Sequence, residues 1–191
     1  MKKIIITGGL GYIGTELCKL YSGYSWKYNV IVIDNRFISE RVNELKRRKI
    51  QFIQADILNY DAIEPYIKDA NVVHHLAGIT DVAYVKKEMD KAKDELTKKV
   101  AIEGTENVLR AMNNNALIVF PSTHVVFEGL KEKRENLNEN EKTNTFLAYS
   151  SSKVENENQI KNSGKKYIIF RLGSVYGFST DTMRINIMPN L

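Results

Sequence analysis

Short apolar runs alternate with longer amphipathic stretches along this chain. Six runs rich in β-branched and aromatic residues have the length of strands: 4–6, 30–33, 50–54, 72–76, 117–120 and 167–171. Helical patterns fall between them: the stretch after Gly14, 39–49, 61–68, a long stretch after Gly78 that ends near Asn113, and 146–161. Strands separated by helices predict a doubly wound α/β fold of Rossmann type, with a mainly parallel sheet and ligands at the strand carboxyl ends.

Prolines and polar clusters set the expected boundaries of these elements. Pro65 predicts that the helix over 61–68 is short or bent, and Pro121 is expected to end the fifth strand. Residues 131–145 are polar enough to predict an exposed loop.

A glycine-rich turn follows the first strand. Gly8, Gly11 and Gly14 are spaced as G-x-x-G-x-x-G, and Ile13, Leu17, Leu20 and Tyr21 then repeat at helical intervals. A strand that turns into a helix in this way directs backbone N–H groups and the positive helix end at one point, where a diphosphate can bind. The second strand ends in Asp34, about 20 residues beyond the last glycine, where a dinucleotide site needs an acid for the ribose hydroxyls.

The position of Asp34 favours NAD over NADP, because a carboxylate repels a 2′-phosphate. Arg36 and Arg41 lie close enough in the sequence to compensate for that repulsion. The pattern predicts NAD as the cofactor.

Tyr149 and Lys153 stand four residues apart on a predicted helix, so their side chains share one face. A tyrosine is a poor base at neutral pH, but a neighbouring ammonium favours the phenolate. Ser122 and Thr123 follow the fifth strand, where a hydroxyl could bind the substrate oxygen whose proton Tyr149 handles; alternatively they begin a turn after Pro121. These features suggest proton transfer beside a dinucleotide.

Composition narrows the class of protein. The chain has 191 residues, enough for one domain with a core, and a formal net charge of +5 with a pI of about 9.1. Its lysines alternate with acids, as over 86–99, which indicates a solvated helix face rather than a nucleic-acid site. Cys18 is the single cysteine, so no internal disulfide forms, a buried inert thiol is expected, and a cytoplasmic location is predicted. No segment has the length of a membrane span.

The histidines predict no metal centre. His74 and His75 are adjacent on a strand, so their side chains face opposite ways. His124 lies beside Thr123 and is a candidate substrate contact, although a neutral loop histidine is the simpler interpretation.

Taken in order, these motifs resemble the extended short-chain dehydrogenase/reductase superfamily, in its NAD-dependent epimerase/dehydratase branch, from one end of the chain to the other. The matching segments are Thr7–Gly14, Asp34–Asn35, Asp56–Ile57, His75–Gly78, Gly104–Thr105, Ser122–Thr123 with Val126, Tyr149–Lys153, and Arg171 with Val175–Gly177.

The resemblance implies a role for each site residue. The NAD-binding set would be Gly8, Gly11, Tyr12, Ile13, Gly14, Asp34, Asn35, Asp56, Ile57, Leu76, Ala77, Gly78, Tyr149 and Lys153. Within it, Asp34 would hold the adenosine ribose, and Asp56 with Ile57 would contact adenine. Thr123, Tyr149 and Lys153 would be catalytic, and Thr123, His124, Tyr149 and Asn186 would contact a nucleotide sugar.

The chain departs from the family pattern at several positions. Ala101 stands where relatives commonly carry asparagine, and Val126-Phe127-Glu128-Gly129 has one residue more than the usual Val-Tyr-Gly. Sugar 4,6-dehydratases place an Asp-Glu pair after the catalytic threonine, whereas His124 and Val125 stand here. Since a valine cannot transfer protons, dehydration is not expected.

By this resemblance, residues 1–178 form the NAD-binding domain and 179–191 begin a smaller substrate-binding region, which the family continues beyond this point. A nucleotide-sugar epimerase, a homodimer in its full-length form, is the leading hypothesis. An NAD(P)-dependent sugar reductase or dehydrogenase is the second, and a dinucleotide-binding module that needs a partner lobe is the third. The 191-residue chain alone is expected to bind NAD without catalysing, because nothing would orient the sugar.

Overall fold

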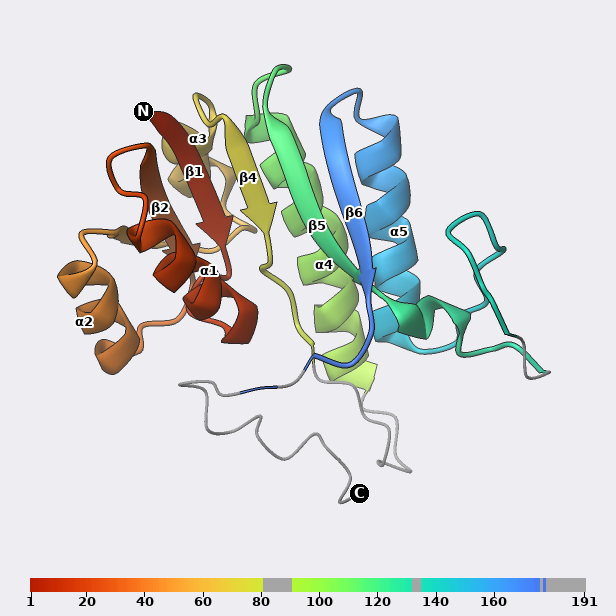
Figure 1. Cartoon of the computed structure of the whole chain (residues 1–191). Helices are drawn as coiled ribbons and strands as arrows, with labels where there is room; N and C mark the ends of the chain where they lie inside the picture. The colour runs from red at the N-terminus through yellow and green to blue at the C-terminus, as the bar shows by residue number, and fades with distance from the viewer. Residues whose placement is uncertain (81–90, 132–134, 176, 178–191) are drawn as a thin grey trace.

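Every apolar run predicted as a strand lies in one parallel sheet (Figure 1). The computed structural model describes residues 1–80, 91–131, 135–175 and 177. Its strands are β1 (Lys2–Thr7), β2 (Tyr28–Asp34), β3 (Gln51–Gln54), β4 (Val72–His75), β5 (Leu117–Thr123) and β6 (Lys166–Leu172). Its helices are α1 (Tyr12–Ser22), α2 (Ser39–Arg47), α3 (Tyr60–Ile67), α4 (Lys91–Ala111), the 3₁₀ turn η1 (His124–Phe127) and α5 (Ala148–Asn162).

The strand order is β3-β2-β1-β4-β5-β6, and each neighbouring pair is parallel. The chain therefore moves outward from β1 to β3, returns to pair β4 with β1, and continues in the opposite direction. In a doubly wound sheet a ligand binds at such a reversal, beyond the carboxyl ends of the strands. The predicted fold class is confirmed.

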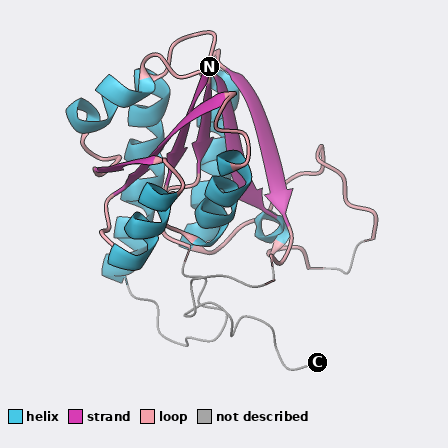
Figure 2. Ribbon diagram, turned by 60° about the vertical axis from the view of Figure 1, so that its left-hand side comes forward, coloured by secondary structure: helices cyan, strands magenta, loops and turns pink. Residues whose placement is uncertain are grey.

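Apolar side chains pack on both faces of the central strands. Ile5 and Ile33 belong to a core beneath α3, α4 and α5, whereas Ile4 and Ile6 belong to a second core beneath α1 and α2. Figure 2 shows helices on both sides of the sheet. This alternation explains why the strands consist of continuous apolar runs.

Among the described residues, helices cover only one face of the last two strands. In Figure 1, α4 and α5 lie behind β5 and β6, while α1 and α2 lie in front of the opposite half of the sheet. On the open face Ile168 pairs with Val119 and Phe170 pairs with Pro121. Ile168 is 42% exposed and Phe170 is 50% exposed, so this face is apolar but not buried among the described residues.

The expected end of the fifth strand at Pro121 is wrong. β5 continues to Thr123 and stays paired with β6 as far as Leu172. β5 pairs with β4 only as far as Val119, so the missing N–H of Pro121 removes no hydrogen bond to β4. The other predicted strands and helices form with boundaries shifted by a few residues, except that the stretch 81–90 at the start of the long helix predicted after Gly78 lies outside the described residues. Within 135–145 the loop is mostly exposed, as predicted.

Candidate active site

The glycine-rich turn between β1 and α1 is closed by backbone contacts that only glycine permits. Gly8 has φ of +68°, and a Cβ there would lie 2.6 Å from the amide nitrogen of Ala77. The amide of Gly11 donates to the carbonyl of Gly8 over 3.0 Å. A Cβ on Gly14 would lie 2.6 Å from the Cα of Gly9. The backbone segments of this turn therefore pack as closely as a diphosphate-binding turn requires.

The first turn of α1 is suited to an anion. Its N-cap is Gly11, which provides no capping side chain, and the turn contains no acidic residue. The free N–H groups and the positive helix end are therefore available to negative charge. These contacts fit the diphosphate of a dinucleotide, and Tyr12 and Ile13 stand at the start of this helix.

Asp34 ends β2 with its carboxylate buried against the glycine turn. Its Oδ2 accepts from the Leu10 amide over 3.0 Å, and its Oδ1 accepts from the amide and Nε of Arg36 over 3.1 and 3.2 Å. Asn35 donates to Asp56 over 3.1 Å, so two of the predicted adenosine contacts adjoin each other. The side chain of Ile57 packs in the core, which leaves only its backbone to face a ligand.

A buried polar chain links the ends of β1 and β4. The Thr7 hydroxyl lies 2.8 Å from His75 Nδ1 and accepts from the Ala77 amide over 3.3 Å. His75 Nε2 lies 3.0 Å from the Thr105 hydroxyl on α4. Burial, assisted by the charge of Lys153, lowers the pKa of His75 to about 3, so the ring is neutral. These hydrogen bonds hold Leu76 and Ala77 beside the glycine turn, and Gly78 follows them in the sequence.

His74 contacts the Tyr21 hydroxyl over 2.7 Å on the opposite face, as the alternation along a strand predicts. The buried-thiol expectation for Cys18 is confirmed, and burial raises its pKa to about 12.

Lys153 ties the middle of α5 to the end of β5. Its Nζ donates to the carbonyl of Pro121 over 2.9 Å. The same nitrogen lies 4.4 Å from the ring centre of Phe120 and 5.8 Å from that of Tyr149. Burial lowers the pKa of Lys153 to about 8, against the opposing effect of Glu157. The predicted pairing of Tyr149 with an ammonium on one helix face is present.

Thr123 and His124 mark the transition from β5 to η1. Thr123 is buried, and its hydroxyl accepts from the Val125 amide over 3.2 Å, so it caps η1. His124 is exposed, with Nδ1 3.1 Å from the carbonyl of Leu172. Both therefore lie at the carboxyl end of β5, whereas Asn186 lies outside the described residues.

The extra residue after η1 has a structural role. Glu128 Oε1 accepts from the amides of Phe146 and Leu147 over 2.9 Å each, and from the Ser150 hydroxyl. A carboxylate at this point satisfies free N–H groups at the start of α5 and complements the helix dipole. Glu128 thus fixes the turn that precedes Tyr149.

The substitution at Ala101 is accompanied by a contact from a neighbouring helix. The Asn156 side-chain amide on α5 donates to the carbonyl of Ala101 over 2.9 Å and to the Thr105 hydroxyl over 3.0 Å. A polar group from α5 thus contacts α4 at this position.

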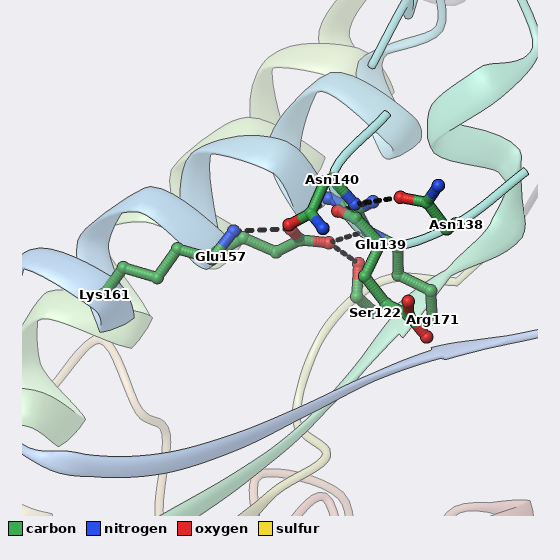
Figure 3. Close-up of polar contacts among 7 residues, drawn as sticks. All are labelled: Ser122, Asn138, Glu139, Asn140, Glu157, Lys161 and Arg171. Atoms are coloured by element: carbon green, nitrogen blue, oxygen red, sulfur yellow. Dashed lines mark hydrogen bonds and ion pairs between the residues drawn. The ribbon is translucent and has the colours of Figure 1, made fainter. Parts of the chain in front are cut away.

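Sequence reasoning missed Glu157, which follows Lys153 by one helical turn. Its buried carboxylate contacts Ser122, Arg171 and Lys161 (Figure 3). The spacing of Tyr149, Lys153 and Glu157 by four residues was the available signal, but its partners depend on the sheet order.

A family model described as the NAD dependent epimerase/dehydratase family matches residues 4–190. The chain belongs to this family. Its cofactor is NAD, and the members similar to this chain are enzymes.

Curated relatives include epimerases and dehydratases. UDP-glucose 4-epimerase of Mus musculus is 33% identical over 145 residues, which are 66% of this chain and 39% of the relative. dTDP-D-glucose 4,6-dehydratase of Dictyostelium discoideum is 28% identical over 198 residues, which are 93% of this chain and 44% of the relative.

Solved structures share the fold. UDP-glucuronic acid 4-epimerase of Bacillus cereus in complex with NAD has a TM-score of 0.73 at 25% identity, covering 92% of this chain and 57% of that one. UDP-glucose 4-epimerase of Thermotoga maritima with UDP-glucose has a TM-score of 0.77 at 24% identity, covering 94% and 58%. This chain spans about half the length of these relatives.

No helix among residues 1–80, 91–131 and 135–175 is both long and apolar enough to cross a bilayer. In the same part of the chain, no three His, Cys, Asp or Glu side chains gather as metal ligands would.

Proposed function

We propose that this chain provides the NAD site and the reacting groups of a nucleotide-sugar epimerase. The observation that carries the proposal is the contact between Lys153 and Pro121, which places the Tyr149–Lys153 face of α5 at the carboxyl end of β5. The glycine turn and Asp34 lie at the carboxyl ends of β1 and β2, on the same edge of the parallel sheet.

Each of these residues has its own role in the proposed reaction. Tyr149 removes the proton from a sugar hydroxyl, and Lys153 stabilises the phenolate that makes this possible. Thr123 binds the oxygen whose proton is transferred, and the α1 turn binds the diphosphate of the cofactor. NAD held at this site would supply the hydride acceptor for oxidation of the sugar carbon and the hydride donor for its reduction from the other face. Tyr149 then returns the proton.

Dehydration is disfavoured by the residues after Thr123. Val125 has no proton to transfer, and Glu128 is held at the start of α5, where its Oε1 accepts from three donors. His124 could transfer one proton, but the acidic pair that water elimination uses is incomplete at these positions. Production of a 4-keto-6-deoxy sugar would contradict this assignment.

The test combines cofactor content with turnover. An epimerase recycles its cofactor, so we expect NAD to remain on the purified chain, and we expect the complete enzyme to release no NADH when UDP-glucose, UDP-N-acetylglucosamine or UDP-glucuronic acid is added. Steady release of NADH would identify a dehydrogenase instead. Calorimetry showing NAD binding, with no turnover of any sugar in the presence of the rest of the enzyme, would identify a dinucleotide-binding module.

The predicted base is tested by Tyr149→Phe. Removing the hydroxyl should leave NAD affinity nearly unchanged and lower the turnover of the complete enzyme by at least about 10²-fold, since general acid–base catalysis contributes that much or more. Tyr167→Phe on the exposed part of β6 is the matched control and should retain wild-type turnover. Full activity of Tyr149→Phe would require another base, and His124 is then the first to examine.

A further inference from the structure

A buried carboxylate outside the predicted catalytic set joins three elements. Glu157 on α5 has a side chain only 2% exposed. Its Oε1 accepts from the Ser122 hydroxyl over 2.6 Å and from Arg171 Nε over 2.9 Å, and its Oε2 accepts from Arg171 Nη2 over 2.8 Å and from Lys161 over 3.1 Å. Figure 3 shows these partners converging on it from β5, β6 and α5.

These contacts fix the carboxyl end of β5 against α5. Pro121, Ser122 and Thr123 are consecutive: the first binds Lys153, the second binds Glu157, and the third caps η1. α5 therefore holds β5 at two points one helical turn apart. Any movement of Ser122 away from Glu157 would displace the carbonyl that orients the Lys153 ammonium.

Glu157 also controls the charge around Lys153. The groups that face Lys153 are Tyr149 and Glu157 on its own helix, His75 on β4, and the Phe120 ring and Pro121 carbonyl on β5. His75 is neutral near pH 7, as described above. The carboxylate of Glu157 is thus the negative charge that opposes the loss of the proton from Lys153.

We propose that Glu157 is a positioning residue for the reaction: it holds the β5 end against α5 and keeps the Lys153 ammonium charged beside Tyr149. This proposal rests on the function proposed above, but its first measurement does not depend on turnover. The carboxylate suits this role because Arg171, Ser122 and Lys161 satisfy it, and it therefore stays ionised.

The charge on Lys153 depends on Glu157 in a defined direction. Burial lowers its pKa from 10.5 to about 8, and Glu157 opposes that fall. Removing the carboxylate charge lets the pKa fall further, so Lys153 loses its proton at a lower pH. Support for the Tyr149 phenolate then disappears at a lower pH as well.

The experiment follows the Cε resonance of Lys153 in ¹³C-labelled lysine by NMR during a pH titration, with Lys153→Arg to assign it. We expect a wild-type midpoint near 8 and a lower midpoint in Glu157→Gln. Glu157→Asp keeps the charge and should restore the midpoint toward the wild type. Lys161→Met removes another partner of the same carboxylate on the exposed side of α5, and its midpoint should not fall.

A second variant keeps the test valid if Glu157→Gln does not fold. The pair Glu157→Met with Arg171→Met replaces a buried ion pair by apolar side chains, an exchange that proteins often tolerate. It should show the same lowered midpoint. If both Glu157→Gln and this double variant titrate as the wild type does, the electrostatic role is overturned and Glu157 serves stability alone.

A second readout connects the residue to turnover. In Glu157→Gln the alkaline limb of the kcat profile should move to lower pH together with the Lys153 midpoint, while KM for the sugar stays within about twofold, since Glu157 does not reach the ligand. A profile that stays in place while the midpoint moves contradicts the link to the reaction. Absence of turnover in the complete wild-type enzyme would refute the proposed function, while the titration of Lys153 still decides this inference.

Discussion

The two halves of the sheet are held together by different forces. Around β1, β2 and β4, apolar side chains fill both faces, and the glycine turn fits by close backbone approach. Around β5 and β6, one face is open, and the Glu157 cluster of buried polar contacts joins both strands to α5. Packing thus dominates in the dinucleotide half, where the buried polar groups Asp34 and His75 lie at the strand ends, whereas the half with Tyr149 and Lys153 depends on a satisfied charge.

This difference has consequences for stability and for chemistry. Apolar packing is insensitive to pH, while a buried carboxylate stabilises the fold only as long as it is ionised and paired. A polar cluster also adds charge–charge interactions with its neighbours, whereas an apolar core acts on titratable groups only through desolvation.

The largest effect is expected from Glu157→Ala. Truncation leaves the Ser122 hydroxyl and the largely buried Arg171 without their acceptor, and breaking a buried ion pair from one side costs about 3–5 kcal/mol. The measurement is urea denaturation of the variant and the wild type. The double Met variant described above should be far less affected, and a cost below about 1 kcal/mol for Glu157→Ala would contradict the contrast between the halves.

The pH dependence of the free energy of unfolding should reveal the contribution of Glu157. Burial alone would raise the pKa of Glu157, but the hydrogen bonds from Arg171, Ser122 and Lys161 outweigh it and lower the pKa from 4.5 to about 2. Because the folded-state pKa is depressed, the stabilisation is complete above pH 4.5 and is lost as the pH falls toward 2.

Protonating Glu157 therefore lowers the free energy of unfolding by on the order of 3 kcal/mol. Thermal unfolding measured between pH 5 and 2 should show it in the wild type, and Glu157→Gln should flatten the curve over that range. An equal slope in both proteins would assign the acid sensitivity to other carboxylates.

A smaller cost is expected at the glycine turn from Gly14→Ala. The new Cβ would meet the Cα of Gly9 at 2.6 Å and its carbonyl oxygen at 2.7 Å, both backbone atoms that cannot move aside freely. Such overpacking costs about 1–3 kcal/mol. Calorimetry should also show weaker NAD binding, because the turn opens. Gly173→Ala meets no atom within 4 Å and is the matched control.

The smallest effect is expected on the open face, from Phe170→Ser. With half of this side chain exposed, the change should alter stability by about 1 kcal/mol or less. Phe120→Ala, in the core of the same sheet, should cost about 3–5 kcal/mol. A similar loss at both positions would show that something covers Phe170 in solution, and light scattering would then reveal whether a second copy does so.

The sequence by itself determined the local parts of this protein. The alternation of apolar runs and helical patterns, the glycine spacing, the acid at the end of β2 and the Tyr149–Lys153 spacing all follow from neighbouring residues. Each depends on periodicity or on the conformational freedom of glycine, which are readable without knowing the fold. They were sufficient to predict the fold class and the cofactor.

Only the tertiary structure decided which distant residues meet. Ser122 and Arg171 lie 35 and 14 residues from Glu157, and the pairing of β6 with β5 brings both to its carboxylate. The same pairing carries β5 past Pro121, and the burial of Lys153 sets the range in which its amine titrates. These properties arise from long-range packing and desolvation, because burial and charge–charge distance have no counterpart in the order of residues along the chain.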